Sequence, residues 1–429
     1  MAEHDAYRRG PVRPHRGLFD FHLCEPELSR PRYASAHTGL GCDGSRGLRL
    51  SGNESRHESG ARRRGGRDGF RLLSDRNEHQ MTSTVKDNDV LSVEQLSVSF
   101  GRSPSVQVVR DIAFSVRKGE IVAIVGESGC GKSTTGLALL GLISDDGAGV
   151  HGSIRLARKD GQTVDIVGMG ERKLQKIRGN DAAMIFQEPM SSLNPLFTIG
   201  TQIQEALSVH RKMSASERAD EALKLVSMLG IPSPQKCLQS YPHQLSGGMR
   251  QRVMIAIALS CNPALLIADE PTTALDVTVQ AQIVDRLKRL QQDTHMSILF
   301  ITHDLALVAE IADRALVMYA GQIVEEGPIT ELFGRPLMPY TQALMRSRPR
   351  LGDARHRIQP IRGSAPNPAA LPAGCAFHPR CEHAVAGLCD VTAPTLETTD
   401  DGKRQVRCLR WRELEQQVHC TPEVEGQLK

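Results

Sequence analysis

Residues 121–133 read IVAIVGESGCGKS, a continuous apolar run followed directly by a glycine-rich loop. The loop fits the pattern Gly-x4-Gly-Lys-Ser/Thr, and a helical pattern over 133–142 follows it, which is the context that this motif requires. Glycines let backbone N–H groups turn toward phosphate oxygens, and the start of a helix adds its positive dipole end. We therefore expect a nucleotide phosphate site made by Gly126, Glu127, Ser128, Gly129, Cys130, Gly131, Lys132, Ser133 and Thr134.

Two side chains of this loop and two acids further along the chain have separate expected roles. Lys132 would bridge the β- and γ-phosphates, and the Ser133 hydroxyl would ligate Mg²⁺. A second buried run, LLIAD, ends at Asp269 and is followed by Glu270. The carboxyl ends of strands are where such sheets bind ligands. We expect Asp269 to hold Mg²⁺ and Glu270 to take a proton from the water that attacks the γ-phosphate.

The segment LSGGM, at residues 245–249, precedes another helical pattern. It supplies a hydroxyl and unhindered backbone amides at a helix start, which is a second anion-binding end. One chain cannot easily place two such helix ends on one γ-phosphate. We therefore expect the second helix end to contact a nucleotide that is bound by a facing subunit. The residues of this segment are Leu245, Ser246, Gly247, Gly248 and Met249.

Strand and helix patterns alternate over most of the chain from residue 91 onward. Short apolar runs suited to strands occupy 91–100, 112–116, 120–125, 182–186, 264–268 and 297–301, and helical patterns occupy 217–229, 249–260, 278–292 and 305–312. This alternation predicts an α/β fold with a mainly parallel sheet and helices on both faces. A mostly helical block at about 190–260 predicts a subdomain inserted between two strands.

From about Val90 to Pro336 these motifs, in this order, resemble those of the ATP-binding cassette (ABC) family of P-loop NTPases. The resemblance implies an ABC nucleotide-binding domain at 81–335 that hydrolyses ATP with Mg²⁺, and two cassettes that close face to face when ATP binds. Gln187 looks like the glutamine that contacts Mg²⁺ or its water. His303 resembles the histidine that contacts the γ-phosphate.

Two weaker assignments also come from this resemblance. Asp276 resembles the loop residue that communicates across the cassette dimer, and Phe100 lies about where the family places an aromatic ring that stacks on adenine. Without the family, Asp276 would be interpreted as an ordinary loop residue, and Phe100 fits core packing as well as adenine stacking. The segment Gln187–Ile203 is the expected docking surface for a membrane protein.

Four cysteines cluster near the C-terminus, separated by five, seven and eighteen residues: Cys375, Cys381, Cys389 and Cys408. In a reducing cytosol, clustered thiols favour a metal site over disulfides. Zinc and an iron–sulfur cluster both accept four thiolates, and ordinary free thiols are the remaining alternative.

The region 336–429 is similar to the C-terminal region of oligopeptide and dipeptide importer ATPases. The similarity lies in PYTQALM at 339–345, IRGSAP at 361–366 and LPAGCAFHPRC at 371–381. It implies an ATPase subunit at the cytoplasmic face of the bacterial inner membrane, with permease subunits, a second ATPase (a paralogue or a second copy) and, indirectly, an extracytoplasmic solute-binding protein. It also implies a four-iron four-sulfur cluster on the four cysteines. Nickel, glutathione or another small solute is the alternative cargo.

Residues 1–80 contain many arginines, no lysine and no clear helix or strand period. Such a segment cannot bury enough apolar surface to fold, so we expect a disordered tail or an extension translated from an early start codon. Met81 opens the first patterned sequence. A basic arm for anionic lipid or nucleic acid is the alternative, weakened by the carboxylates among the arginines.

The composition excludes several classes of protein. A formal net charge of +4 is too small for a nucleic-acid binder, so we expect no nucleic-acid partner. The apolar runs are far shorter than the roughly 20 residues of a membrane-spanning helix, and no signal peptide is recognisable. A cassette ATPase that acts on DNA or ribosomes is the competing function. The roughly 110 residues between Lys132 and Ser246 leave no space for the long coiled coil of such proteins.

Overall fold

The computed structural model describes residues 88–101, 105–143, 147–187, 192–273, 275–347 and 359–419. The segment 1–80, for which we predicted disorder or a non-native extension, lies outside these residues. So does 188–191, which is part of the expected docking surface.

Among the described residues, the largest sheet has eight strands in the order β11-β12-β10-β9-β3-β8-β7-β6. The five strands from β9 to the edge strand β6 are parallel, which confirms the predicted parallel sheet. Beyond β9 the pairs are antiparallel. The strands are β3 (Ile121–Val125), β6 (Ala182–Ile185), β7 (Leu265–Asp269), β8 (Ser297–Thr302), β9 (Arg314–Tyr319), β10 (Gln322–Pro328), β11 (Glu397–Thr398) and β12 (Gln405–Val406).

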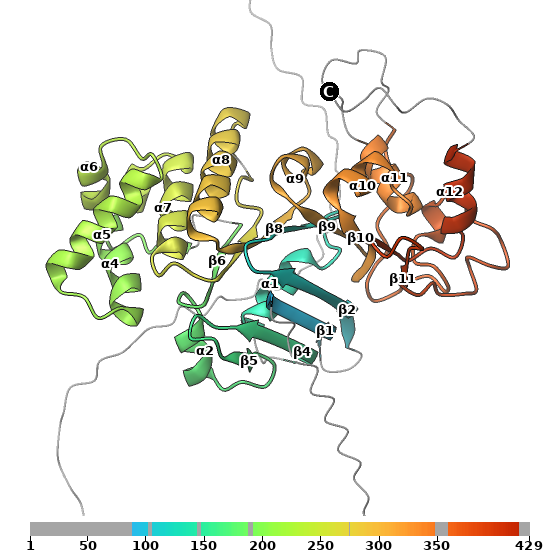
Figure 1. Cartoon of the computed structure of the whole chain (residues 1–429), viewed down its shortest axis with the longest axis horizontal. Helices are drawn as coiled ribbons and strands as arrows, with labels where there is room; N and C mark the ends of the chain where they lie inside the picture. The colour runs from blue at the N-terminus through green and yellow to red at the C-terminus, as the bar shows by residue number, and fades with distance from the viewer. Residues whose placement is uncertain are drawn as a thin grey trace, which may run out of the picture. The chain divides into compact units, whose positions relative to one another are not determined.

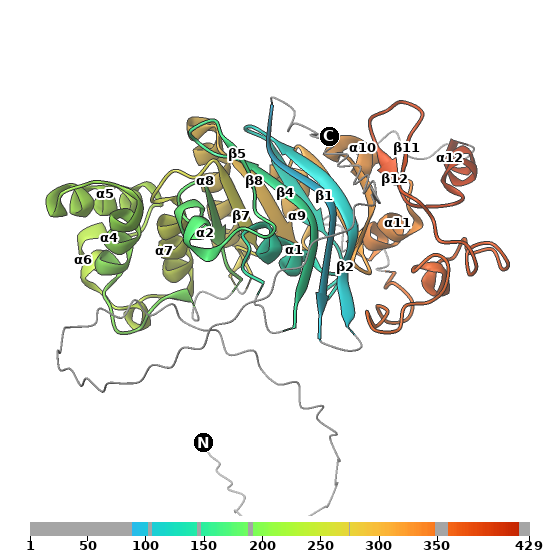
Figure 2. The same ribbon diagram turned by 90° about the horizontal axis from the view of Figure 1, so that it is seen from below.

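A second sheet, which the sequence interpretation missed, is antiparallel throughout, in the order β2-β1-β4-β5. Figure 2 shows β1, β2 and β4 lying side by side as a curved layer. No helix separates β1 from β2, and two strands joined directly can pair only as antiparallel neighbours. These strands are β1 (Asp89–Phe100), β2 (Val106–Arg117), β4 (Gly149–Ala157) and β5 (Thr163–Asp165).

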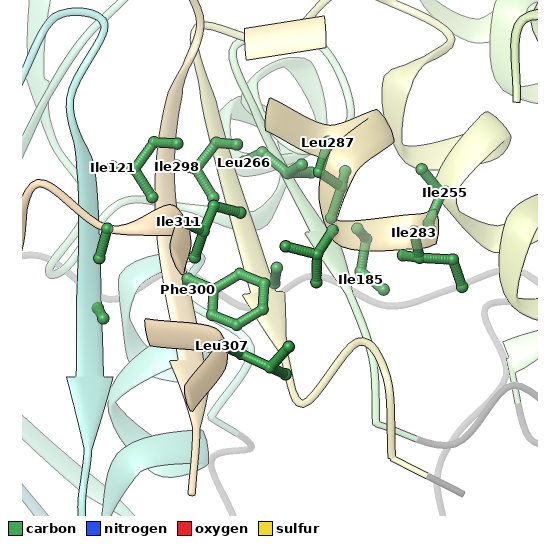
Figure 3. Close-up of a cluster of buried hydrophobic side chains, with 14 of the residues drawn as sticks. Ile121, Ile185, Ile255, Leu266, Ile283, Leu287, Ile298, Phe300, Leu307 and Ile311 are labelled. Atoms are coloured by element: carbon green, nitrogen blue, oxygen red, sulfur yellow. The ribbon is translucent and has the colours of Figure 1, made fainter. Parts of the chain in front are cut away.

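The two faces of the parallel strands belong to two different cores. Successive side chains of a strand point to opposite faces, so Ile121 and Ala123 join one cluster while Val122 and Ile124 join the other. The second cluster packs helix α1 (Lys132–Leu139) with the antiparallel sheet. The first packs helices α7 (Gly247–Leu259), α8 (Val277–Thr294) and α9 (Leu305–Ile311). Figure 3 shows Phe300 of β8 between Ile311 and Leu307 of α9 in this cluster.

The predicted helical block at 190–260 is helical in the structure. It contains α4 (Ile199–His210), α5 (Ala215–Met228), α6 (Pro234–Gln239), a 3₁₀ turn at Pro242–Gln244, and α7. In Figure 1, α4, α5 and α6 form a group of helices beside α7. A capping box begins α5, where Ser214 and Glu217 bond each other's backbone N–H groups. A short helix outside this block, α2 (Glu171–Ile177), follows β5.

The C-terminal region packs into the core of the cassette. Strand β12 pairs with β10, and Phe377, Val406 and Trp411 belong to the same buried cluster as β3. The helices here are α10 (Ile329–Gly334), α11 (Pro339–Arg346), a 3₁₀ turn at His378–Arg380 and α12 (Trp411–His419). In the part of the chain that the structure describes, no helix has the length and apolarity needed to cross a membrane.

Candidate nucleotide site

The glycine-rich loop leaves β3 and leads into α1 with backbone angles that favour glycine. Gly126 and Gly131 have φ of +154° and +104°, and a Cβ atom on Gly126 would lie 2.2 Å from the Met318 carbonyl oxygen. A side chain at this position would therefore collide with backbone. The Lys132 ammonium donates to the carbonyl oxygens of Gly126 and Glu127, at 2.9 and 3.0 Å, so the loop folds around its own lysine.

The structure brings Ser133 and Asp269 together. The Ser133 hydroxyl at the start of α1 donates to Asp269 Oδ1 at 3.0 Å, and Asp269 ends β7 with only 4% of its surface exposed. Burial raises the pKa of Asp269 to about 6, although the Ser133 hydrogen bond acts in the opposite direction. A buried carboxylate beside a hydroxyl is an oxygen donor set suited to Mg²⁺. These residues therefore fit the expected metal.

Glu270 lies at the centre of a network of polar side chains. Its Oε2 accepts hydrogen bonds from Gln187 Nε2 at 3.1 Å and Thr273 Oγ1 at 2.8 Å, and its Oε1 lies 3.1 Å from His303 Nδ1. Burial acts to raise its pKa, but the bonds with Thr273 and His303 outweigh burial and leave the pKa below its usual value. Glu270 is thus suited to remain an ionised carboxylate at neutral pH.

The backbone of Glu270 is also unusual. Its φ is +46°, a left-handed conformation that costs an L-residue roughly 1–2 kcal/mol. Its N–H donates to the Ile301 carbonyl of β8 at 2.8 Å, which holds it in place. Strain of this kind concentrates at functional sites because the surrounding structure must fix a side chain in one direction. The conformation directs the network that joins Gln187, Thr273 and His303.

The remaining predicted residues lie in other parts of the cassette. Ser246 is exposed and caps α7, accepting the Met249 N–H at 3.3 Å; Leu245 is buried, and Gly247 is exposed. Asp276 caps α8 in the same way, accepting the Val279 N–H at 2.9 Å. These contacts account for the local helix starts and leave the roles across a dimer as predictions.

For the other residues predicted to contact ATP, the structure gives a location and an exposure but does not test the predicted role. Phe100 is the last residue of β1 and is 38% exposed, as expected for a ring that is open to a ligand, and its stacking on adenine stays a prediction. Ser128 and Gly129 are exposed in the loop, and Thr134 is half-buried in α1. Cys130 is buried, and burial raises the pKa of its thiol, so only its backbone is suited to meet a phosphate.

One residue of the network, Thr273, and one residue that supports its loop, Gln251, were not predicted from the sequence. Thr273 follows the acids in a Pro-Thr-Thr run, a signal too common to single out. Gln251 of α7 is 1% exposed, and its side-chain amide donates to the Pro271 carbonyl at 2.5 Å. This bond connects the helix that follows the Ser-Gly-Gly segment to the loop that carries Glu270, and no sequence pattern singles out Gln251, which lies between Arg250 and Arg252.

An apolar groove lies beside Gln187 and between the sheet and the helical block. It has a volume of about 340 Å³ and is lined by Leu142, Met184, Phe186, Leu193, Val209 and Ile257, among others. Val209 is 66% exposed, and just after Leu193 the chain exposes Leu196 (79%) and Phe197 (48%). In the described part of the expected docking surface, Leu196 and Phe197 are thus apolar and open to solvent, whereas Leu193, Ile199 and Ile203 are buried.

The four clustered cysteines line one small pocket between α11 and α12. Burial raises the pKa of the Cys375 and Cys381 thiols and brings that of Cys408 to about 12. Within the described ranges, however, no three His, Cys, Asp or Glu side chains are placed to hold a metal ion. The thiols share a pocket but do not converge, and this arrangement does not support the expected iron–sulfur cluster.

A parallel sheet with this loop after β3 and an acid pair after β7 defines a P-loop nucleotide-binding protein. The family described as ABC transporter matches residues 109–273, and the family described as oligopeptide/dipeptide transporter, C-terminal region, matches 324–389. A solved dimeric post-hydrolysis ATP-binding cassette, bound to ADP and Pi, has a TM-score of 0.50 and 26% identity. It covers 56% of this chain and 98% of that one.

Curated relatives match over nearly their whole length. The oligopeptide transport ATP-binding protein AppD of Bacillus subtilis is 48% identical over 326 residues, covering 76% of this chain and 97% of AppD. The dipeptide transport ATP-binding protein DppD of Escherichia coli is 47% identical over 320 residues, covering 74% and 96%. The chain belongs to the ATP-hydrolysing subunits of ABC transporters, in the group that carries the oligopeptide/dipeptide transporter C-terminal region.

Proposed function

We propose that this chain energises the import of dipeptides and oligopeptides across a bacterial inner membrane. The observation that carries the proposal is the C-terminal match over 324–389, together with relatives named for oligopeptide and dipeptide transport along nearly their full length. Nickel, glutathione or another small solute remains the alternative cargo, because the chain contacts the permease and not the solute.

The test is uptake by the bacterium that encodes the chain, in a strain deprived of its other peptide transporters. Replacing the native chain by its Lys132→Ala variant should abolish uptake of a labelled dipeptide and leave nickel and glutathione uptake unchanged. A strain that kept peptide uptake but lost that of nickel or glutathione would overturn the peptide assignment in favour of the alternative.

The roles of the site residues follow from the network around Glu270. Lys132 and the loop amides would hold the ATP phosphates. Ser133, Asp269 and Gln187 would hold Mg²⁺, which supplies charge neutralisation on the phosphate oxygens. Glu270 would take a proton from the attacking water, and His303, bonded to the same carboxylate, would orient it and contact the γ-phosphate. The low pKa of Glu270 favours the ionised form that a base requires.

We place the second half of each reaction site on another cassette, either a second copy or a paralogue. Ser246 and Gly247 are exposed at the start of α7, so a phosphate offered by a facing subunit can reach the N–H groups there. Hydrolysis by the chain should then rise more steeply than linearly with its concentration. Turnover per chain that is independent of dilution, in a strictly monomeric preparation, would exclude this arrangement.

The apolar groove beside Gln187 is the proposed contact with the permease, at the cytoplasmic face of the membrane. Because Gln187 bonds Glu270 at 3.1 Å, a partner seated in the groove would lie one residue away from the hydrolytic network. An extracytoplasmic solute-binding protein would act on this chain only indirectly, through the permease. No nucleic acid is part of the proposal.

The four-thiol pocket is the proposed place for a four-iron four-sulfur cluster. Four cysteines on one pocket supply the right donors, and the thiols would have to approach one another to ligate it. Iron and sulfide analysis with a visible spectrum of anaerobically purified protein tests the idea. Four irons and four sulfides per chain are expected. Protein that contains zinc alone, or no metal, would exclude the cluster.

A further inference from the structure

An ion pair joins the phosphate loop to the cysteine-rich region. Arg380, in the 3₁₀ turn between Cys375 and Cys381, donates from both terminal nitrogens to the two carboxylate oxygens of Glu127, at 2.6 and 2.9 Å. The Arg380 side chain is 6% exposed and that of Glu127 26%. A bidentate, largely buried pair of this kind fixes both the distance and the orientation of its partners.

Arg380 is itself held from several directions. Its Nε donates to the Arg362 carbonyl at 2.7 Å and one terminal nitrogen to the Tyr319 hydroxyl at 3.3 Å. Its guanidinium carbon lies 5.9 Å from the ring centre of Tyr319 and 6.0 Å from that of Phe377, distances at which a cation and an aromatic face attract each other. The guanidinium is thus aimed at Glu127 before any ligand binds.

A second residue of the C-terminal region also holds Glu127. The hydroxyl of Tyr340, on α11, accepts the backbone N–H of Glu127 at 2.9 Å. Tyr340 is fully buried, and its ring centre lies 4.5 Å from that of Tyr319 and 5.3 Å from that of Phe377. The carboxylate and the backbone of Glu127 are therefore both fixed by residues from beyond 335.

We propose that Arg380 and Tyr340 are positioning residues of the nucleotide site, and that the C-terminal region thereby sets the affinity for ATP. The Glu127 carbonyl is one of the two that hold the Lys132 ammonium, so a displacement of Glu127 passes directly to the lysine that meets the phosphates. The inference rests on the nucleotide site proposed above.

The negative charge of Glu127 allows a specific test of the proposal by nucleotide affinity. An unpaired Glu127 carboxylate would repel the incoming triphosphate, and Arg380 neutralises it. Arg380→Ala should raise the Kd for AMP-PNP with Mg²⁺ about tenfold, within the usual range for coupled sites, and should raise the KM for ATP while kcat changes less than twofold. Adding Glu127→Gln to that variant should return the Kd to within about twofold of the native value, because the unpaired charge is gone.

The experiment uses the full-length chain and three comparisons. Arg412→Ala is the matched control, because Arg412 lies in the same region, pairs with Glu397 and Asp400, and stacks on Trp411. Its Kd should equal the native value. If Arg380→Ala does not fold, Arg380→Gln keeps part of the stem and carries the same test. Lys132→Ala should abolish binding in either case.

Each outcome decides something. Native affinity in the Arg380 variants would overturn the positioning role. A weakened affinity that Glu127→Gln does not restore would overturn the neutralisation of the Glu127 charge by Arg380. Retained binding by Lys132→Ala would instead overturn the proposed nucleotide site itself. The two failures are therefore distinguishable in one series of titrations.

Discussion

The helical block and the C-terminal region are both attached to the same cassette, but they differ in what they do with their large apolar side chains. The helical block leaves apolar side chains such as Leu196 and Val209 open to solvent. The C-terminal region instead buries Phe377 and Trp411 in the core that contains β3. It also sends Arg380 into an ion pair with the phosphate loop.

This difference separates two ways of acting on one ATP site. An exposed apolar groove is suited to contact with another protein, so we propose that the helical block acts on the ATP site through a partner. The C-terminal region anchors Phe377 and Trp411 in the core and bonds the phosphate loop through Arg380, so we propose that it acts on the ATP site within its own chain. If this division holds, the largest effect should come from a change at Glu270, the centre of the hydrolytic network.

Glu270→Gln should reduce ATP turnover about 10²- to 10⁴-fold, the usual contribution of a general base, while the Kd for ATP stays within about twofold. The amide can still accept a bond from Thr273 but cannot take a proton. Single-turnover kinetics and equilibrium binding measure the two quantities. Asp285→Asn, which alters an exposed acid of α8 that pairs with Arg289, is the control for folding.

Full hydrolysis by Glu270→Gln would remove the base assignment, and the network around Glu270 would then have only a structural role. If the variant lost ATP binding as well, the carboxylate would belong to the binding machinery, like the phosphate loop. The helical block and the C-terminal region would then not be acting on one shared hydrolytic centre.

A buried carboxylate gives the C-terminal junction a pH dependence. Glu325 of β10 is fully buried, and its two oxygens accept the backbone N–H groups of Leu337 and Met338 at 2.8 and 3.1 Å. Burial raises its pKa to about 7, although these two bonds act in the opposite direction. The folded chain therefore keeps a proton that the unfolded chain releases near pH 4.5.

The direction in which the unfolding free energy changes with pH follows from this difference in pKa. The stabilisation from protonated Glu325 is complete below about pH 4.5 and is lost as pH rises toward 7. The native chain should therefore lose about 3 kcal/mol of unfolding free energy relative to Glu325→Gln over that range. Urea unfolding of both proteins at several pH values measures it. Parallel curves for the two proteins would show that Glu325 is ionised in the folded chain throughout.

Local motifs were predictable from the sequence, and contacts between distant segments were not. The loop around Lys132 and the acids after β7 follow short patterns whose chemistry is legible residue by residue. The resemblance supplied Gln187 and His303, and the structure places both beside Glu270. The spacing of the motifs alone would not have assigned either residue to the site.

Two features could not be predicted from the sequence for physical reasons, and a third was predictable but was missed. Glu127 and Arg380 are 253 positions apart, and their pairing depends on how Phe377 packs against Tyr319. The adjacent acids Glu325 and Glu326 cannot be distinguished in the sequence, because only the fold shows which of them accepts backbone N–H groups. The antiparallel sheet did leave a signal, because no helical pattern lies between the runs at 91–100 and 112–116.

The smallest expected effect on the isolated chain concerns the apolar surface of the helical block. Leu196 is 79% exposed, so Leu196→Asp should change the unfolding free energy by no more than about 0.5 kcal/mol and leave basal ATP hydrolysis unchanged. In membranes containing the permease it should abolish stimulated hydrolysis, because a charge would enter an apolar contact. Val391→Asp, at a side chain 69% exposed in the C-terminal region, should leave both activities intact. If the two variants behaved alike with the permease present, the exposed segment at Leu196 would not be part of the contact, and the division between the two regions would fail.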